Sequence, residues 1–214
     1  MFVLTETYSI ANHFLAELRN QETQKDAMRF RKNMERLGEI FAYEISKTLT
    51  YQNRDVETQL GAKITQQVSQ QVVLVTILRA GLPLHQGLLN YYDKAENAFI
   101  GAYRGKHDEK ESFEIEMDYI TSPDIQDKVL IISDPMLATG KSIEKAYHAM
   151  LRYGIPAKTH IVSAIASRRG VRFIKARLPQ CRLWIGDIDE DMNSKSYIVP
   201  GLGDAGDLAY GGKV

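Results

Sequence analysis

The sequence predicts an α/β fold in which a mainly parallel, twisted sheet is flanked by helices. From Val72 onward, short apolar runs rich in β-formers recur along the chain. Most of the segments between them have the spacing of amphipathic helices. Runs that are apolar at every position are typical of strands buried on both faces of a parallel sheet. One such run leads directly into an acid and then a Thr-Gly-Lys-Ser turn, as strands that carry a ligand loop do.

The size of the chain predicts one domain over residues 1–214, because 44% of its residues are hydrophobic and can build a single core. Residues 1–71 are expected to form N-terminal helices and an arm, and residues 72–214 the core. The 27 basic and 27 acidic side chains balance. This balance argues against nucleic acid or a membrane surface as a partner held by bulk charge.

The N-terminal residues MFVLTETYSI lack the basic and long apolar regions of a secretory leader. Cys181 is the single cysteine, so no intramolecular disulfide is possible. The longest apolar run, VVLVTIL, is far shorter than the ~20 residues of a membrane helix. We therefore expect a cytoplasmic protein.

Apolar positions at helical spacing predict a long amphipathic helix from about Thr23 to Leu49. The alternating segment VETQLGAKITQQV predicts a hairpin that turns near Gly61 and could form an arm. The expected strands are Val72–Leu78, Ala98–Tyr103, Val129–Ser133, His160–Ala166 and Arg182–Ile185. The expected helices of the core are Leu82–Tyr92, Ser142–Tyr153 and Gly170–Ala176. The polar stretch between Arg104 and Asp127 is expected to be an exposed hairpin or loop that acts as a lid.

The segment VLIISDPMLATGKSI places Asp134 directly after a buried strand, at the edge of the sheet where ligands bind. The turn that follows opens a helix, so its amides and the positive end of the helix dipole predict a phosphate site. In a triphosphatase loop the first glycine would stand at the position of Pro135. Proline has no amide to donate and fixes φ, so this loop does not suit a nucleotide triphosphate.

An apolar strand, an acid, apolar residues and Thr-Gly-x-Ser together resemble the 5-phosphoribosyl diphosphate (PRPP) signature of type I phosphoribosyltransferases. The form DPMLATG is characteristic of the uracil phosphoribosyltransferase branch, although most of the superfamily has a second acid where Pro135 stands. Three further stretches match that branch in order: ILRAGL at Ile77–Leu82, AYRG at Ala102–Gly105 and IVPGLGDAGD at Ile198–Asp207. The resemblance covers most of Val72–Asp207.

This resemblance implies the fold of the type I phosphoribosyltransferases and the conversion of uracil and PRPP into UMP and pyrophosphate. The implied catalytic residues are Arg79 and Arg104, which face pyrophosphate, and Asp134, which holds the ribose hydroxyls. The implied PRPP-binding residues are Arg79, Arg104, Asp134, Pro135, Met136, Leu137, Ala138, Thr139, Gly140, Lys141, Ser142 and Asp204. The implied uracil-binding residues are Ile198, Gly203, Asp204 and Ala205. Lys141 replaces a usual glycine, and Leu208 replaces a common basic residue.

Three other patterns are given structural interpretations. DIDEDMNSKSYI, which begins at Asp187, lacks the glycine and the glutamate of a calcium loop, so we interpret it as a solvated acidic loop. SRRGVRFIKAR, which begins at Ser167, is interpreted as the exposed basic face of a helix rather than an RNA site. The five histidines lack zinc-ligand spacing, so no metal site made of protein ligands is expected.

The resemblance also implies Mg²⁺ as cofactor, bound mainly through pyrophosphate, a homo-oligomer (dimer or tetramer) and a possible GTP effector. Rate is expected to come from positioning and from charge stabilisation, without a covalent nucleophile. Three alternatives remain. They are a phosphoribosyltransferase for orotate or a purine, a phosphate-loop nucleoside kinase, and an RNA-binding regulator of the same fold with little activity.

Overall fold

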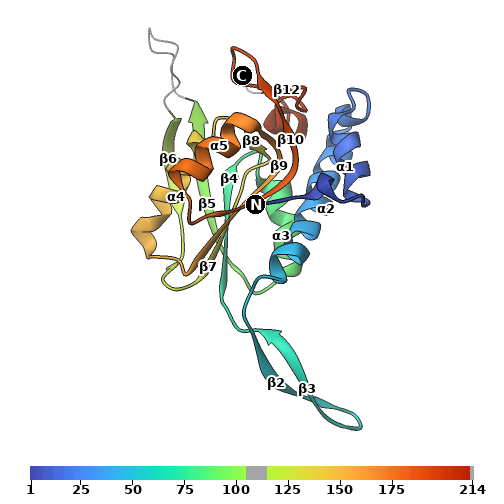
Figure 1. Ribbon diagram of the computed structural model, residues 1–214, viewed down its shortest axis with the longest axis vertical. Coiled ribbons are helices and arrows are strands. Elements are labelled where there is room, and N and C mark those ends of the chain that lie inside the picture. Colours follow the sequence, from blue (N-terminus) through green and yellow to red (C-terminus); the bar gives the residue numbers. More distant parts are fainter. Residues whose placement is uncertain (105–114, 213–214) are drawn as a thin grey trace.

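A parallel sheet runs through the centre of the protein, as the computed structural model in Figure 1 shows. The structure describes residues 1–104 and 115–212, and the side chains of all of these except 102–104 and 115–118. The helices are α1 (Ala11–Arg19), α2 (Ala27–Ser46), α3 (Leu82–Tyr91), α4 (Lys141–Met150), α5 (Arg168–Arg177) and α6 (Ala205–Tyr210). The strands are β1 (Phe2–Val3), β2 (Tyr51–Thr58), β3 (Gly61–Val68), β4 (Val72–Leu78), β5 (Glu96–Arg104), β6 (Ile115–Thr121), β7 (Val129–Ser133), β8 (Met136–Leu137), β9 (Lys158–Ser167), β10 (Arg182–Asp189), β11 (Asp191–Met192) and β12 (Ile198–Val199). Short 3-10 helices cover Leu4–Glu6, Thr23–Lys25 and Leu151–Tyr153.

The main sheet has the strand order β1-β10-β9-β7-β4-β5-β6, and β8 pairs with β9. Its pairings are parallel except for β6, which runs antiparallel to β5. Thr76 of β4 lies beside Ser133, the last residue of β7, so β4 runs two residues farther, to Leu78, at the same edge of the sheet. The predicted α/β class is confirmed, and the strands Val72–Leu78 and Val129–Ser133 have the bounds expected from their apolar runs.

Helices cover both faces of this sheet (Figure 1). One core lies between the sheet and helices α1, α2 and α3 and includes Trp184, Phe41 and Leu74. The second core lies under α4 and α5 and includes Ile132 and Ile174. Alternate residues of β4 and β7 enter opposite cores, which explains why these strands are apolar at every position except Thr76 and Ser133.

Helix α2 begins at its cap Asp26, whose side chain accepts a hydrogen bond from the Arg29 amide. It packs closely on α3, because both helices carry a glycine at the contact. A Cβ on Gly87 would stand 1.9 Å from the Glu35 carbonyl oxygen, and one on Gly38 would stand 2.3 Å from the Leu84 carbonyl oxygen. This contact holds the N-terminal end of α3, which directly follows the Arg79 turn.

The hairpin β2–β3 projects away from the body of the protein as a two-stranded arm (Figure 1). The sequence predicted this hairpin, although the strands begin earlier than expected, at Tyr51. Most of its side chains are exposed, including Leu60 and Ile64. The arm therefore contributes little to the core of this chain.

Among the residues that the structure describes, no helix is long and apolar enough to cross a membrane. The cytoplasmic location expected from the sequence stays a prediction. Residues 105–114, within the polar stretch that was expected to act as a lid, lie outside the described part of the chain, and the lid stays a prediction.

Candidate active site

The predicted site residues gather at the carboxyl ends of the central strands. Arg79 directly follows β4, and Asp134 directly follows the neighbouring strand β7. Arg104 ends β5, the strand on the other side of β4, but its side chain lies outside the described part. The parallel sheet thus brings residues that are far apart in the chain to one edge.

Asp134 is held at the start of its loop by hydrogen bonds. Its amide donates to the Val162 carbonyl oxygen at 3.1 Å, and its carboxylate oxygen Oδ1 accepts from the Met136 amide at 3.2 Å. Burial raises the pKa of this carboxyl group to about 6, and the Met136 hydrogen bond offsets only part of the rise. Ionisation of Asp134 is therefore unfavourable in the free protein. A bound group that stabilises the negative charge would favour the ionised form.

The loop after Asp134 is shaped by strand β9 and helix α5. Pro135 offers its carbonyl oxygen to the Ile165 amide at 3.1 Å, and Met136 and Leu137 pair with β9 as β8. The Ser167 hydroxyl donates to the Ala138 carbonyl oxygen at 2.6 Å. These contacts use the carbonyl side of the loop, and they fix its path toward α4.

Helix α4 begins at Gly140, which adopts a left-handed conformation with φ 83°. A side chain there would be strained, and its Cβ would stand 2.7 Å from a ring carbon of Phe173. The cap residue Gly140 has no side chain to accept from this helix end, and the Lys141 amide donates to the Thr139 hydroxyl oxygen at 3.4 Å. The following amides of the first turn are the ones that can bind an anion. Lys141 is exposed at the first position of the helix, and Thr139 and Ser142 flank it.

The Arg79 turn is tied to helix α6. Its guanidinium nitrogen Nη2 donates to the Asp207 carboxylate at 3.1 Å and to the Gly211 carbonyl oxygen at 2.8 Å. Its Nε is buried without a hydrogen-bond partner. The peptide bond between Leu78 and Arg79 is cis. Asp207 was not among the residues predicted from the sequence, because only the fold brings it to Arg79.

The glycine-rich segment Ile198–Asp207 lies over this edge of the sheet. Asp204 caps α6 by accepting from the Gly206 and Asp207 amides at 2.9 and 3.1 Å. Gly203 is exposed with φ 92°, whereas the side chains of Ile198 and Ala205 are buried. The side chains of these last two residues are therefore not presented to a ligand.

The acidic segment after Asp187 was interpreted as a solvated loop, and this interpretation is wrong for its first residues. Asp187 and Asp189 end strand β10, and both accept hydrogen bonds from Arg19. Asp189 is 7% exposed. The sequence does not reveal this pairing, because Arg19 lies 170 residues away from Asp189.

The described His, Cys, Asp and Glu side chains form no group of three that could hold a metal ion.

Comparisons with known proteins agree on one family. The family model described as uracil phosphoribosyltransferase matches residues 5–212. A curated uracil phosphoribosyltransferase from Porphyromonas gingivalis is 54% identical over 208 residues, with 97% of this chain and 96% of that protein covered. Another from Pyrococcus furiosus is 38% identical over 200 residues, with 92% of this chain and 84% of that protein covered.

Solved structures agree in fold. A protein from Aquifex aeolicus superposes with a TM-score of 0.87 at 32% identity, covering 98% of each chain. A protein from Thermus thermophilus superposes with a TM-score of 0.52 at 11% identity, covering 75% of this chain and 85% of the other, which shows the shared fold alone.

Proposed function

This chain belongs to the uracil phosphoribosyltransferase family, and we propose that the residues gathered at its sheet edge carry out the family's reaction. The chain is an enzyme that converts uracil and PRPP into UMP and pyrophosphate. PRPP binds between the Arg79 turn and the Asp134 loop, and uracil binds against the main chain of Ile198–Ala205.

One observation supports this arrangement above the others. β4 and β7 are parallel neighbours, and β4 runs two residues past its last pair with β7, Thr76 with Ser133, so the Arg79 turn and Asp134 both lie at the carboxyl-end edge of the sheet. The Arg79–Asp207 contact at 3.1 Å then brings α6, and with it the glycine-rich segment, to the same place. A guanidinium, a carboxylate and an open helix end are the groups that a pyrophosphate, a ribose and a 5-phosphate require.

In this proposal the 5-phosphate sits on the loop Ala138–Ser142, where amides at the start of α4 and the hydroxyl groups of Thr139 and Ser142 donate to it. Pro135, Met136 and Leu137 shape the loop through their contacts with β9 rather than by touching phosphate with side chains. Lys141 is exposed at the same helix end and adds a positive charge.

Uracil is read by main-chain groups near Gly203 and Ala205, because glycine lets the backbone approach a planar base closely. Asp204 is placed on the PRPP side and at the same time caps α6. The base would thus bind against a turn whose shape is fixed by the hydrogen bonds of Asp204 to the Gly206 and Asp207 amides.

The reaction breaks the bond between C1 of the ribose and a pyrophosphate oxygen and forms a bond from C1 to N1 of uracil. Pyrophosphate leaves with the electron pair, and the N1 proton of uracil is released. Arg79 and Arg104 stabilise the charge that develops on the leaving group, and Asp134 orients the ribose hydroxyls. No residue of the chain is assigned as the acceptor of the N1 proton.

The residues present are compatible with Mg²⁺. This ion prefers oxygen ligands and keeps several waters, so it binds through one or two carboxylates together with substrate phosphates. Asp134 and Asp204 are the carboxylates on the proposed PRPP side, and pyrophosphate would supply most of the remaining ligands. When bound, the ion neutralises negative charge on the leaving pyrophosphate.

Conversion of radiolabelled uracil in the presence of PRPP and Mg²⁺ tests the proposed function. We expect label to appear in UMP, and we expect orotate, hypoxanthine and adenine, offered in parallel, to give no nucleotide. A reaction that prefers orotate or a purine would contradict the assignment of the base pocket. ATP-dependent phosphorylation of uridine, or RNA binding without UMP formation, would instead support the kinase or the RNA-binding regulator.

We further propose that the chain forms a homo-oligomer through the arm β2–β3. The arm is a two-stranded hairpin with most of its side chains exposed, including Leu60 completely and Ile64 to 61%, and a hairpin of this kind is at best marginally stable without further packing. A second copy of the chain that received the arm would cover them. We expect sedimentation to give the mass of a dimer or tetramer, and Ile64→Lys to lower it. Unchanged assembly in that variant would contradict a role for the arm.

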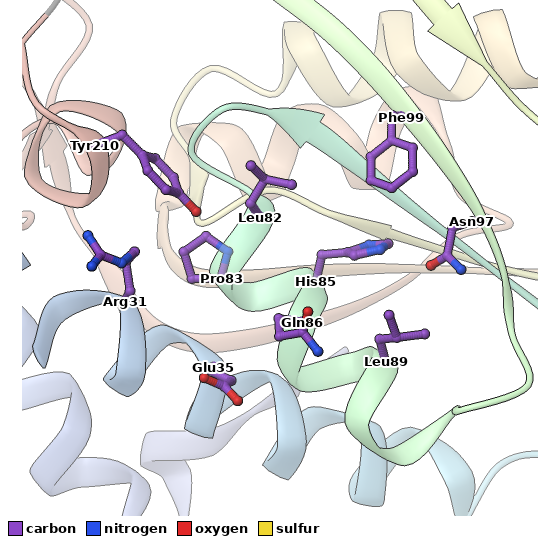
Figure 2. Close-up of a pocket in the computed structure, with 10 residues that line it drawn as sticks. All are labelled: Arg31, Glu35, Leu82, Pro83, His85, Gln86, Leu89, Asn97, Phe99 and Tyr210. Carbon is purple, nitrogen blue, oxygen red and sulfur yellow. The ribbon is translucent and has the colours of Figure 1, made fainter. Parts of the chain in front are cut away.

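A possible GTP effector would require a second site, and the pocket in Figure 2 is our candidate. It has a volume of about 530 Å³, which lies in the usual range for small-molecule sites. Arg31 and Tyr210 lie toward one end, and His85 and Asn97 lie toward the other. Both ring nitrogens of the buried His85 and the Oδ1 atom of Asn97 lack hydrogen-bond partners.

The uracil assay, run with and without GTP, tests this candidate. If GTP changes the rate, Tyr210→Ala and His85→Leu are expected to remove the change. A GTP effect that both variants retain would exclude the pocket.

A further inference from the structure

Arg19, the last residue of α1, makes the densest set of polar contacts around the glycine-rich segment. Its Nη1 and Nη2 atoms donate to the two carboxylate oxygens of Asp189 at 2.8 and 2.9 Å. Nη2 also donates to Asp187 at 2.8 Å, and Nη1 also donates to the Gly201 carbonyl oxygen at 2.9 Å. A forked arginine–carboxylate pair of this kind is strong and fixed in direction.

The same pair binds both backbone polar groups of Gly201. Asp189 accepts from the Gly201 amide at 3.1 Å, while Arg19 donates to the Gly201 carbonyl oxygen. Gly201 has φ 59°, and a Cβ there would stand 2.2 Å from the Ile198 carbonyl oxygen. The turn is therefore tight, and its two backbone groups are both committed to the Arg19–Asp189 pair.

A second contact from the same part of the chain reaches the next residue of the turn. The Gln24 side-chain nitrogen lies 2.9 Å from the Leu18 carbonyl oxygen and 2.8 Å from the Leu202 carbonyl oxygen, in the amide orientation that satisfies both. The Thr5 hydroxyl also donates to the Asp187 carboxylate at 2.9 Å. Residues of the N-terminal region thus hold Gly201 and Leu202, which directly precede Gly203.

We infer that Arg19 and Asp189 are positioning residues for uracil recognition. They hold the turn Gly201–Gly203 in the shape that lets the main chain near Gly203 and Ala205 meet the base. Neither residue is assigned a contact with substrate. This inference rests on the proposed uracil pocket, and it predicts that the affinity for uracil depends on the pair while the affinity for PRPP does not.

The burial of the pair determines how variants should behave. The side chains of Arg19 and Asp189 are 20% and 7% exposed, so removing the arginine leaves a buried carboxylate without its partner. Removing both charges avoids that penalty. The loss of uracil affinity in Arg19→Gln should therefore be smaller when Asp189→Asn is added. Two independent substitutions would instead add their effects.

The test compares KM for uracil and KM for PRPP in the full-length enzyme. We expect Arg19→Gln to raise KM for uracil by about 10-fold or more, a change of roughly 1.4 kcal/mol, and to leave KM for PRPP within about twofold. The double variant Arg19→Gln/Asp189→Asn is expected to lie closer to the parent than Arg19→Gln does. Arg29→Gln is the matched control, because it removes an exposed arginine–carboxylate pair between Arg29 of α2 and Glu17 of α1.

If Arg19→Gln is poorly folded, Asp187→Asn provides the same comparison, because it removes one branch of the network at a half-buried position. A folded Arg19→Gln or Asp187→Asn variant with the parent's KM for uracil would overturn the inference. Equal rises in both KM values would also overturn it, since they would indicate a general structural role.

Gly203→Ala separates failure of the inference from failure of the proposed pocket. A side chain at φ 92° is strained, so this variant should raise KM for uracil if the pocket is correctly placed. If Gly203→Ala raises KM for uracil and the Arg19 variant does not, the inference alone is wrong. If neither variant raises KM for uracil, the proposed base pocket is wrong as well.

Discussion

Replacing Asp134 with asparagine is expected to lower the turnover of uracil to UMP by about 10² or more, the usual scale for removing one preorganised electrostatic partner. The variant keeps the size of the side chain and an oxygen for the Met136 amide, so the loop should keep its path. Steady-state UMP formation measures the effect. Asp93→Asn, an exposed position on the same chain, is the control. Parent-like turnover in Asp134→Asn would remove the carboxylate from the mechanism.

The same substitution is expected to stabilise the free enzyme at neutral pH. The pKa of Asp134 is raised from 3.8 to about 6 in the folded protein, mainly by burial, so folding favours the protonated carboxyl group. Its contribution to stability is fully present below about pH 4 and is lost as the pH rises through about 6. Asparagine does not ionise, so Asp134→Asn avoids this loss.

Thermal unfolding measured across pH tests the direction of this effect. Asp134→Asn should unfold a few degrees above the parent at pH 8, which corresponds to about 1–3 kcal/mol. The difference should vanish near pH 4. A variant that unfolds below the parent at pH 8 would contradict the raised pKa. A loss of activity together with a gain in stability would show that the site favours ligand binding and lowers the stability of the ligand-free protein.

Replacing Arg79 with glutamine is expected to lower kcat/KM for PRPP by about 10², because a charge-assisted contact with the leaving pyrophosphate is lost. In the free enzyme this guanidinium is bound to Asp207 and to the Gly211 carbonyl oxygen. We expect pyrophosphate to replace Asp207 as its partner. Initial rates at saturating uracil, with PRPP varied, measure the change.

Two further variants sharpen the Arg79 result. Asp207→Asn removes the competing carboxylate, so KM for PRPP should not rise. Arg177→Gln, which removes an exposed pair with Glu144, should leave the kinetics unchanged. If Arg79→Gln keeps the parent's kcat/KM for PRPP, the assignment of this turn to pyrophosphate is wrong.

Elements with a strong local pattern could be predicted from the sequence. The apolar runs of β4 and β7 predicted both strands, because a strand buried on both faces is a nearly continuous apolar run. The periodic segment of α2 predicted the long helix. The helix begins at Ala27 rather than at Thr23, because Asp26 caps it there. The candidate site loop was predicted because Asp134 follows a strand at the edge of a parallel sheet where ligands bind, and because DPMLATG resembles the PRPP signature.

Elements that depend on distant contacts were missed. β1 has two residues and exists only through its pairing with β10. α6 has six residues in a glycine-rich segment of low helix propensity. Its cap Asp204 and the contact of Arg31 with the Ala209 carbonyl oxygen hold it in place. Short elements like these carry too little local information to be read from their own residues.

The sequence by itself determined the class of fold and the succession of strands and helices along the core part of the chain. It also determined the acid and glycine motifs that identify the family. These features are local, since a buried strand or a ligand loop imposes its pattern on consecutive residues. Only the tertiary structure decided that Asp207 meets Arg79 and that Arg19 reaches across 170 residues to Asp189. Ion pairs of this kind are formed when the fold removes water from two distant charges, and no spacing in the sequence records which charges those will be.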